Sequence, residues 1–321
     1  MKWQLSPRLG MAFPVTEQGI LRLFYGQVFQ IPNFEFLYRN PYFRQSAAGV
    51  SGPFGNADLQ PQKTIKGELG LQQQFGNDIS VDVALYFNDI RNLNGTAFIQ
   101  QFFDGRAYTK FVNTDYALVR GLTISVNKRF TSGFNFGIDY TFQVAQGNAS
   151  DPQAAAFAIQ ANPENPILPT QLIPLDWDQR HTVNITAAYT IEGWELSSIM
   201  RYGSGFPYTP DLNAPFPILT RGSRGEIVTN SRLLPSTFTV DVRAQKIFKI
   251  EGYNVGFFVQ VYNLFDADNQ SGLFPFAQLT PDLVLRNTTV SSSVNSPSEF
   301  LRQPQNFAPP RQILSGISVY F

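Results

Sequence analysis

The last stretch of the chain, residues 311–321, reads RQILSGISVYF and guides the interpretation of the rest. Ile313, Ser315, Ile317, Val319 and Phe321 share one face of the alternation, and the other face, smaller and more polar as a whole, consists of Gln312, Leu314, Gly316, Ser318 and Tyr320. A period of two is typical of a β-strand with one apolar face. A soluble sheet rarely leaves such a terminal strand uncovered, because an open edge invites aggregation. The stretch therefore favours a strand of a closed transmembrane barrel over the last strand of a soluble β-sandwich, which is the alternative.

The composition limits the classes of protein that need to be considered. Only 15% of the 321 residues are charged, whereas about a quarter are charged in a typical soluble domain. Lys and Arg together number 24, as do Asp and Glu, so no basic excess points to a nucleic-acid partner. The absence of Cys excludes a disulfide framework and a thiolate metal site. No apolar run reaches the roughly 18 residues that a transmembrane helix needs.

The chain repeats one unit: a strand, a tight turn, a second strand and a long loop. This pattern predicts an all-β fold, an antiparallel transmembrane β-barrel segment of about eleven strands with short periplasmic turns and long extracellular loops. Residues 89–116, 145–179, 203–236 and 265–310 are expected to be the long connections, with strand-like extensions near 108–112 and a short Ala-rich helix at 154–162. The expected strands before the last one are 6–13, 20–29, 64–75, 79–88, 117–130, 134–144, 181–191, 194–202, 238–248 and 253–264.

Aromatic residues gather at the short-turn ends of these strands, which predicts one interfacial girdle. They are Phe13, Phe75, Phe130, Phe134, Tyr189, Trp194, Phe248, Tyr253 and Phe321. Single-chain bacterial barrels normally have an even number of strands, and the first strand here would run toward the periplasm. No apolar segment of a signal peptide follows the initial MKWQLSPRLG. We therefore expect residues 1–321 to be the C-terminal part of a longer barrel.

Several stretches carry a family resemblance as a set and in order. They are SPRLGMAFPVTEQGILRLFYGQVFQIP (6–32), GLQQQFGNDISVDVALYFNDIRNL (70–93), NTDYALVRGLTISVNKRF (113–130), YTFQVAQGNASDP (140–152), PLDWDQRHTVNITAAY (174–189), FVQVYNLFDADN (258–269) and PRQILSGISVYF (310–321). With them, the chain resembles the C-terminal half of the barrel of a TonB-dependent outer-membrane receptor, and is most similar to the Oar-like group with a carboxypeptidase-regulatory-like domain.

The resemblance implies a location and a set of partners. The location is the outer membrane of a Gram-negative bacterium, and the activity is TonB-dependent import of a nutrient such as a siderophore, oligosaccharide or peptide. It implies contacts with outer-membrane lipid, with a plug domain and the TonB complex through an N-terminal part absent here, and with the barrel assembly machinery. That machinery would read Ile317, Val319 and Phe321 as an assembly signal. No cofactor and no nucleic acid are implied.

Two groups of residues are candidates for contact with a ligand or the plug. Along each strand, the residues that alternate with the apolar ones form a polar side. Charged residues on this polar side would line the lumen or touch the plug, because the interior of such a barrel is polar. They are Glu68, Asp82, Asp139, Asp241 and Arg243. Residues of two loop segments could meet a ligand at the extracellular mouth. They are Phe34, Phe36 and Tyr38 in IPNFEFLY, and Trp177, Arg180 and His181 in DWDQRH.

The single histidine, His181, does not predict an enzyme. A catalytic triad or a metal site needs a nucleophile or more ligands, and the spacing around Asp176 and Asp178 supplies neither. We expect no catalytic and no metal-binding residues, and the simpler interpretation of this motif is that Asp–Arg pairs and Trp177 anchor a loop. Two rival functions stay open. One is a self-contained passive channel of about twelve strands, and the other is a barrel hydrolase in which Ser204 or Ser236 approaches His181.

Overall fold

The structure, a computed structural model, describes residues 3–40, 52–100, 107–161, 170–209, 229–250, 252–270 and 307–320. Within these ranges nearly every ordered element is a strand. The elements are β1 (Arg8–Thr16), β2 (Gly19–Gln30), α1 (Phe34–Tyr38), β3 (Gln62–Phe75), β4 (Ile79–Gln100), β5 (Ala107–Thr131), β6 (Phe134–Gly147), α2 (Ala154–Ala161), β7 (Ile173–Pro174), β8 (His181–Ile191), β9 (Trp194–Gly203), β10 (Pro207–Tyr208), β11 (Arg232–Leu233), β12 (Thr237–Ile250), β13 (Tyr253–Tyr262) and β14 (Gln312–Tyr320).

Eleven long strands follow one another in a single hydrogen-bonded order, β1-β2-β3-β4-β5-β6-β8-β9-β12-β13-β14. The short strand β7 pairs with β6, and β10 pairs with β11 in a separate two-stranded sheet. The hairpins β1–β2, β8–β9 and β12–β13 are antiparallel. The expected all-β architecture of about eleven strands, with sequence neighbours paired, is therefore confirmed. Among the described residues, no helix is long and apolar enough to cross a membrane.

Strands β4 and β5 are longer than the sequence pattern predicts. The sequence predicts a connection at 89–116 with strand-like extensions only near 108–112, whereas residues 89–100 and 107–116 extend the two strands. The alternation of apolar and polar residues fails at Asn92, whose positive φ of 58° interrupts the pleat of the strand. Beyond Asn92, apolar and polar residues no longer follow a period of two. The side chain of Asn113 donates to the carbonyl of Asn92 at 2.8 Å and tethers the two extensions. The Ala-rich helix is confirmed as α2.

Two-residue turns join the hairpins β5–β6 and β8–β9. Ser132 and Gly133 have φ of 53° and 78°, and Glu192 and Gly193 have φ of 46° and 80°. Positive φ at both positions gives the turn a twist that matches the right-handed twist of the strands. The carbonyl of Gly133 also accepts the N–H of Thr190 at 2.7 Å. The turn residues thus take part in pairing with the next hairpin.

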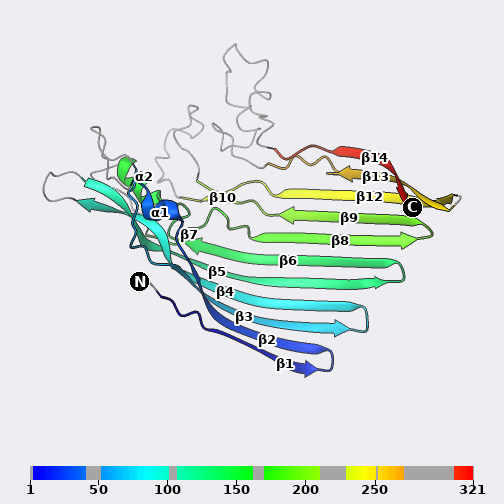
Figure 1. Ribbon diagram of the computed structural model, residues 1–321, viewed down its shortest axis with the longest axis horizontal. Helices are drawn as coiled ribbons and strands as arrows, with labels where there is room; N and C mark the ends of the chain where they lie inside the picture. Colours follow the sequence, from blue (N-terminus) through cyan, green and yellow to red (C-terminus); the bar gives the residue numbers. More distant parts are fainter. Residues whose placement is uncertain are drawn as a thin grey trace, which may run out of the picture. The chain divides into compact units, whose positions relative to one another are not determined.

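The chain divides into two compact units, which are described separately. The first contains residues 1–72, 83–122 and 143–178. We call the strand ends that carry the long connections the loop-side ends, and the ends at the tight turns the turn-side ends. Figure 1 shows α1 and α2 beside the loop-side ends of β4 and β5. Its buried apolar cluster consists of Ala117, Val119, Ala145 and Leu175, with Tyr86, Ile90 and Leu93 packed against it. This unit has a small core of its own because loop segments cover the strand extensions.

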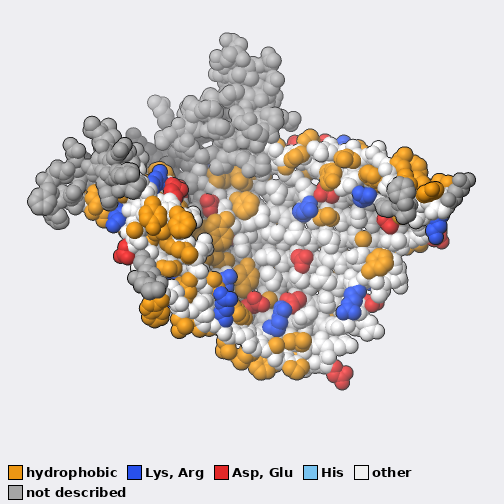
Figure 2. Space-filling view, viewed as in Figure 1, with side chains coloured by type: hydrophobic (Ala, Val, Ile, Leu, Met, Phe, Trp, Pro, Cys, Tyr) orange, Lys and Arg blue, Asp and Glu red, His pale blue; other side chains and the backbone are white. Residues whose placement is uncertain are grey.

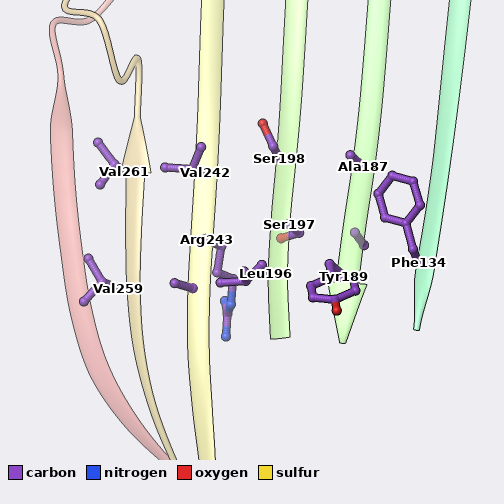
Figure 3. Close-up of a pocket in the computed structure, with 12 residues that line it drawn as sticks. Phe134, Ala187, Tyr189, Leu196, Ser197, Ser198, Val242, Arg243, Val259 and Val261 are labelled. Atoms are coloured by element: carbon purple, nitrogen blue, oxygen red, sulfur yellow. The ribbon is translucent and has the colours of Figure 1, made fainter. Parts of the chain in front are cut away.

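The second unit contains residues 73–82, 123–142 and 179–321. Here the pairing register places alternate residues of β8, β9, β12 and β13 on opposite faces. One apolar row runs through Ala187, Ser198, Val242 and Val261, and Figure 3 shows these side chains in line across the strands. We call the face that carries this row the apolar face and the opposite one the polar face.

The register sorts the side chains of these strands onto the two faces, with Asp241 and Arg243 on the polar face as the sequence predicts. Val183, Ile185, Ala187, Val255, Phe257, Val259 and Val261 lie on the apolar face, while Asn184, Thr186, Asp241 and Arg243 lie on the polar face. Nothing in the described residues buries the apolar face, since Phe257 and Val259 remain 48% and 47% exposed. Exposed apolar side chains on one face of a sheet are expected where that face meets lipid.

The aromatic residues near the tight turns are exposed as well. Phe13, Phe75, Phe130, Phe134, Tyr189, Trp194, Phe248 and Tyr253 all keep at least 36% of their surface accessible. Phe134 meets Tyr189 edge to face at 6.4 Å, and Phe248 meets Phe257 in the same way at 5.9 Å. The remaining member of the expected girdle, Phe321, lies outside the described residues.

Candidate functional site

The polar face of β9, β12 and β13 carries a chain of hydrogen-bonded polar side chains. Asp241, at the loop-side half of β12, accepts a charged hydrogen bond from Arg201 at 3.1 Å. Its other oxygen accepts the backbone N–H of Asn263 at 3.0 Å. Asp241 therefore both balances a cation and fixes the start of the segment that follows β13. The Arg201 side chain is 53% exposed, so its guanidinium is accessible from the space that this face borders.

Arg243, two residues further along β12, is held by three neighbours on the same face. Its guanidinium donates to Gln245 at 2.8 Å and to Gln260 at 3.4 Å. It also lies 4.4 Å from the centre of the Phe258 ring, a cation–π contact. These contacts fix a positive charge in place at a half-buried position, which is a geometry suited to meeting another protein surface or a passing polar ligand.

The other charged residues assigned to the polar side lie on separate strands. Asp139 of β6 is exposed and accepts a hydrogen bond from the hydroxyl of Ser125 at 2.6 Å. Glu68 of β3 is exposed and Asp82 of β4 is half-buried. In the view of Figure 2, Lys, Arg, Asp and Glu side chains are scattered among uncharged ones rather than gathered by sign. The charged groups are thus distributed over the strands.

The first loop-mouth group lies on the short helix α1, where the sequence predicts a loop. Phe34 and Tyr38 are 73% and 60% exposed, whereas Phe36 packs on the fully buried Phe111 with ring centres 4.7 Å apart. The backbone of Phe36 accepts the N–H of Asn56 at 2.8 Å, which fastens the helix to the following segment. Two aromatic rings of this group are therefore available to a ligand, and the third supports the helix.

The DWDQRH motif forms a corner between β7 and β8. Asp178 is fully buried and accepts the N–H of Ala145 at 2.7 Å, and the N–H of Leu175 donates to the Ala145 carbonyl at 3.0 Å. Trp177 is 43% exposed, and Arg180 is half-buried. The motif anchors the corner through a carboxylate bonded to a backbone amide, a partner that sequence reasoning did not identify.

His181 shares the parity of Val183 and so lies on the apolar face, at the loop-side end of β8. Its Nδ1 lies 2.9 Å from the Tyr140 hydroxyl, and its ring lies 5.3 Å from the ring of Phe142. The hydroxyl of Ser204 accepts the backbone N–H of His181 at 3.0 Å. The arrangement is that of an interfacial aromatic cluster with a polar tip. No group of three or more His, Asp or Glu suited to a metal ion occurs among the described residues.

The sequence pattern did not point to three contributors to this region. Arg201 has the parity of the polar face and could have been found by the same alternation that found Asp241. Asn263 and Asn269 could not, because their role depends on the shape of the YNLFDADN segment. Asn263 bonds the N–H and the carbonyl of Ala267 at 2.9 Å and 3.1 Å. Asn269 bonds the N–H and the carbonyl of Phe238 at 2.7 Å and 2.8 Å, which ties this segment back to β12.

An array of antiparallel strands with one exposed apolar face, one polar face and tight turns at one end defines an outer-membrane β-barrel segment. A family model agrees: residues 1–264 match the TonB-dependent receptor-like β-barrel, and the chain belongs to that family. The family places it in the Gram-negative outer membrane, and its members are transporters. No curated protein sequence matches the chain.

Solved structures show the same fold. The chain is similar to a mutant of the ferric enterobactin receptor PfeA from Pseudomonas aeruginosa, with 16% identity, a TM-score of 0.60, and coverage of 98% of this chain and 39% of that one. It is also similar to the outer-membrane transporter YddB from Escherichia coli, with 12% identity, a TM-score of 0.60, and coverage of 83% of this chain and 37% of that one. The siderophore receptor PirA from Acinetobacter baumannii is similar as well, with 18% identity, a TM-score of 0.55, and coverage of 98% of this chain and 40% of that one. The chain thus spans about two fifths of the length of these structures.

Proposed function

We propose that this chain is the C-terminal part of the barrel of a receptor that imports a nutrient across the outer membrane, with energy delivered by the TonB complex through a plug domain. Membership of the receptor family is the observation that supports this most. The fixed charges of the polar face, Asp241 with Arg201 and Arg243 with Gln245, would border the plug and the path of the ligand. The Oar-like subgroup stays a prediction.

The class of ligand is part of the proposal. Two of the similar structures bear the names of a ferric enterobactin receptor and a siderophore receptor. A ferric siderophore is therefore the first candidate to test, ahead of an oligosaccharide or a peptide. Exposed aromatic rings at Phe34, Tyr38 and Trp177 would contact it at the mouth.

Transport is tested in a strain that lacks its own receptors for the nutrient. Expression of the whole receptor that contains this chain should restore growth on the ligand only when TonB is intact, and residues 1–321 alone should not restore it. Uptake that is independent of TonB, or a steady ion conductance of the chain alone in planar bilayers, would instead support the passive channel of about twelve strands.

Ligand contact is tested at the mouth. Phe34→Ala and Tyr38→Ala should each weaken binding of the ligand to cells several-fold, because stacking area is lost. Phe157→Ala serves as the matched control, since Phe157 is 52% exposed on α2 and is outside the proposed set. Equal losses in all three variants would argue against a specific mouth site.

The assembly signal is also carried forward as a proposal. Ile317 and Val319 are 64% and 46% exposed on β14, while Phe321 lies outside the described residues. Phe321→Ala in the whole receptor should lower the amount of folded barrel in outer membranes while leaving the stability of detergent-refolded protein unchanged. Equal membrane levels would contradict the proposal.

A further inference from the structure

The apolar face of the second unit has a hollow of about 350 Å³ across β6, β8, β9, β12 and β13. The register explains it. In one row of residues across the strands, the short side chains of Ala187 and Ser198 lie opposite each other. In the next row, the short Ala244 lies opposite the longer Leu196. Figure 3 shows the rings of Phe134 and Tyr189 at one side of the hollow, and Val259 and Val261 at the other. Short side chains form the floor and the longer ones form the walls.

The lining of the hollow is almost entirely apolar, and its volume lies in the range of small-molecule sites, about 300–1,000 Å³. A hollow of this kind on a face that meets lipid suits a hydrocarbon chain. Because the walls belong to five neighbouring strands of one unit, the shape does not depend on any loop.

A positive charge lies at the turn-side end of the hollow. Lys246 follows Ala244 by two residues on the same face of β12 and is paired in register with Trp194. Its ammonium group lies 5.2 Å from the centre of the Trp194 ring and donates to the Glu192 carbonyl at 2.7 Å. A lysine has three donors, so two remain for a further acceptor, and no carboxylate in the described part of the chain is bonded to this ammonium group.

A second lysine lies on the other side of the hollow, in the same unit. Lys128 of β5 lies 5.7 Å from the centre of the Phe134 ring. It donates to the Thr131 hydroxyl at 2.7 Å and to the Phe134 carbonyl at 3.1 Å. Both lysines thus place a positive charge at the short-turn ends of strands, which in this family face the periplasm. The carboxylate of Asp78 is also at this end and accepts the Thr131 hydroxyl at 3.1 Å.

We propose that this hollow binds one phospholipid of the periplasmic leaflet, with an acyl chain between Ala187, Ser198 and Ala244 and an anionic headgroup phosphate on Lys246. From Lys246 to Val242 the strand advances about 13 Å, enough for the upper part of an acyl chain below its headgroup. The order of groups along β12, first charge and then apolar hollow, matches the order along the lipid. The proposal goes beyond transport and does not depend on it.

The test uses receptor purified from outer membranes and stripped of lipid in detergent. Dioleoyl phosphatidylglycerol and dioleoyl phosphatidylethanolamine are titrated separately, and bound lipids are counted by native mass spectrometry. The two lipids carry the same chains, so their difference reports the headgroup. Wild-type protein should retain phosphatidylglycerol about fivefold more tightly, the factor expected for one lysine near an anionic lipid.

Variants separate the two parts of the site. Ala244→Phe and Ser198→Leu fill the hollow from different strands and should weaken retention of both lipids, while Val183→Phe, on the same face outside the hollow, should not. Lys246→Gln should remove the preference for phosphatidylglycerol. Its control is Lys249→Gln, which removes a charge from the same hairpin on the opposite face.

Each outcome decides the proposal. If Ala244→Phe and Ser198→Leu, both shown to be folded by heat-modifiable migration, retain phosphatidylglycerol as the wild type does, the hollow is not the site. Equal affinity of wild-type protein for the two lipids overturns the headgroup assignment. Loss of a wild-type dimer in Ala244→Phe, with lipid retention unchanged, would assign the hollow to a second copy of the chain.

Discussion

The fully buried carboxylate of Asp178 shows what single residues do in the first unit. It accepts the Ala145 N–H and closes the corner on which Leu175 packs into the apolar cluster. We expect Asp178→Ala to leave a buried amide without its partner, at a cost of about 1–3 kcal/mol. The free energy of opening at the Ala145 amide, measured by hydrogen exchange, should fall by that amount. Asp178→Asn retains an acceptor oxygen and should lose much less.

Asp176→Ala is the matched control, because the Asp176 side chain is exposed in the same motif. If it lowers protection of the Ala145 amide as much as Asp178→Ala does, the corner is stabilised by the charge of the motif and not by the hydrogen bond.

Asp115, on the loop-side extension of β5, should make local stability depend on pH. Burial raises the pKa of its carboxyl above the ordinary value of 3.8, against the opposing effect of hydrogen bonds from Asn148 and Thr114. An acid with a raised pKa in the folded state contributes stability that is present below 3.8 and is lost as pH rises through the folded pKa. Protection of the Tyr116 amide, which donates to Asn148 at 2.8 Å, should therefore increase as pH falls.

Asp115→Asn should remove this dependence and keep the hydrogen bond with Asn148. Exchange rates are corrected for the intrinsic effect of pH and compared between the two proteins. A protection profile of the wild type that is flat from neutral pH down to the ordinary pKa, or that rises with pH, would contradict the assignment.

Single residues also mark the limit of what alternation predicts. The faces of Asp241 and Arg243 follow from a period of two, and the register agrees. The neighbours of His181 do not follow from it, because the Tyr140 hydroxyl comes from β6 and reaches the imidazole only through the pairing of β6 with β8. Asp178 looked like a partner for Arg180 in sequence, and its bond to a distant backbone amide depends on the fold of the corner.

At the scale of elements, the sequence predicts where strands occur better than it predicts where each strand begins and ends. β8 begins and ends where the alternation of His181 to Ile191 begins and ends. β4 continues past its predicted end because the positive φ of Asn92 breaks the period without ending the strand, and β5 begins before its predicted start. Hydrogen bonds such as that from the side chain of Asn113 to the carbonyl of Gln60, at 3.0 Å, stabilise the extensions and come from residues far apart in sequence.

The tight turns give a prediction at this scale. A Cβ on Gly133 would lie 2.3 Å from the Thr190 carbonyl oxygen, in addition to the strain of a φ of 78°. The left-handed conformation alone costs a non-glycine residue about 1–2 kcal/mol, so Gly133→Ala should lower the free energy of unfolding by more than this. The control is Gly252→Ala, whose φ is also positive but whose Cβ would meet no atom within 4 Å. Denaturant titration in lipid vesicles measures both, and equal losses would show that the contact with Thr190 is relieved by a small shift.

At the scale of the whole molecule, one alternation organises both the environment and the function. Along β8, β9, β12 and β13, most apolar residues share one face and most polar residues the other. A chain of this kind has little apolar core there, and its stability in a membrane depends on backbone pairing and on lipid around the apolar face. The same alternation leaves the polar face free to carry charged side chains such as Asp241 and Arg243.

Two neighbouring residues near the middle of β8 test this separation directly. Ile185 lies on the apolar face and Thr186 on the polar face, one position apart along the same strand. Ile185→Arg places a guanidinium in lipid near the midplane, which should lower the free energy of unfolding by about 2–4 kcal/mol. Thr186→Arg adds the same side chain toward a polar interior and should change it far less. Urea titration of both variants in vesicles measures the difference, and because depth and side chain are matched, only the face differs. A larger loss for Thr186→Arg would reverse the assignment of the faces, and equal losses would mean that neither face meets lipid.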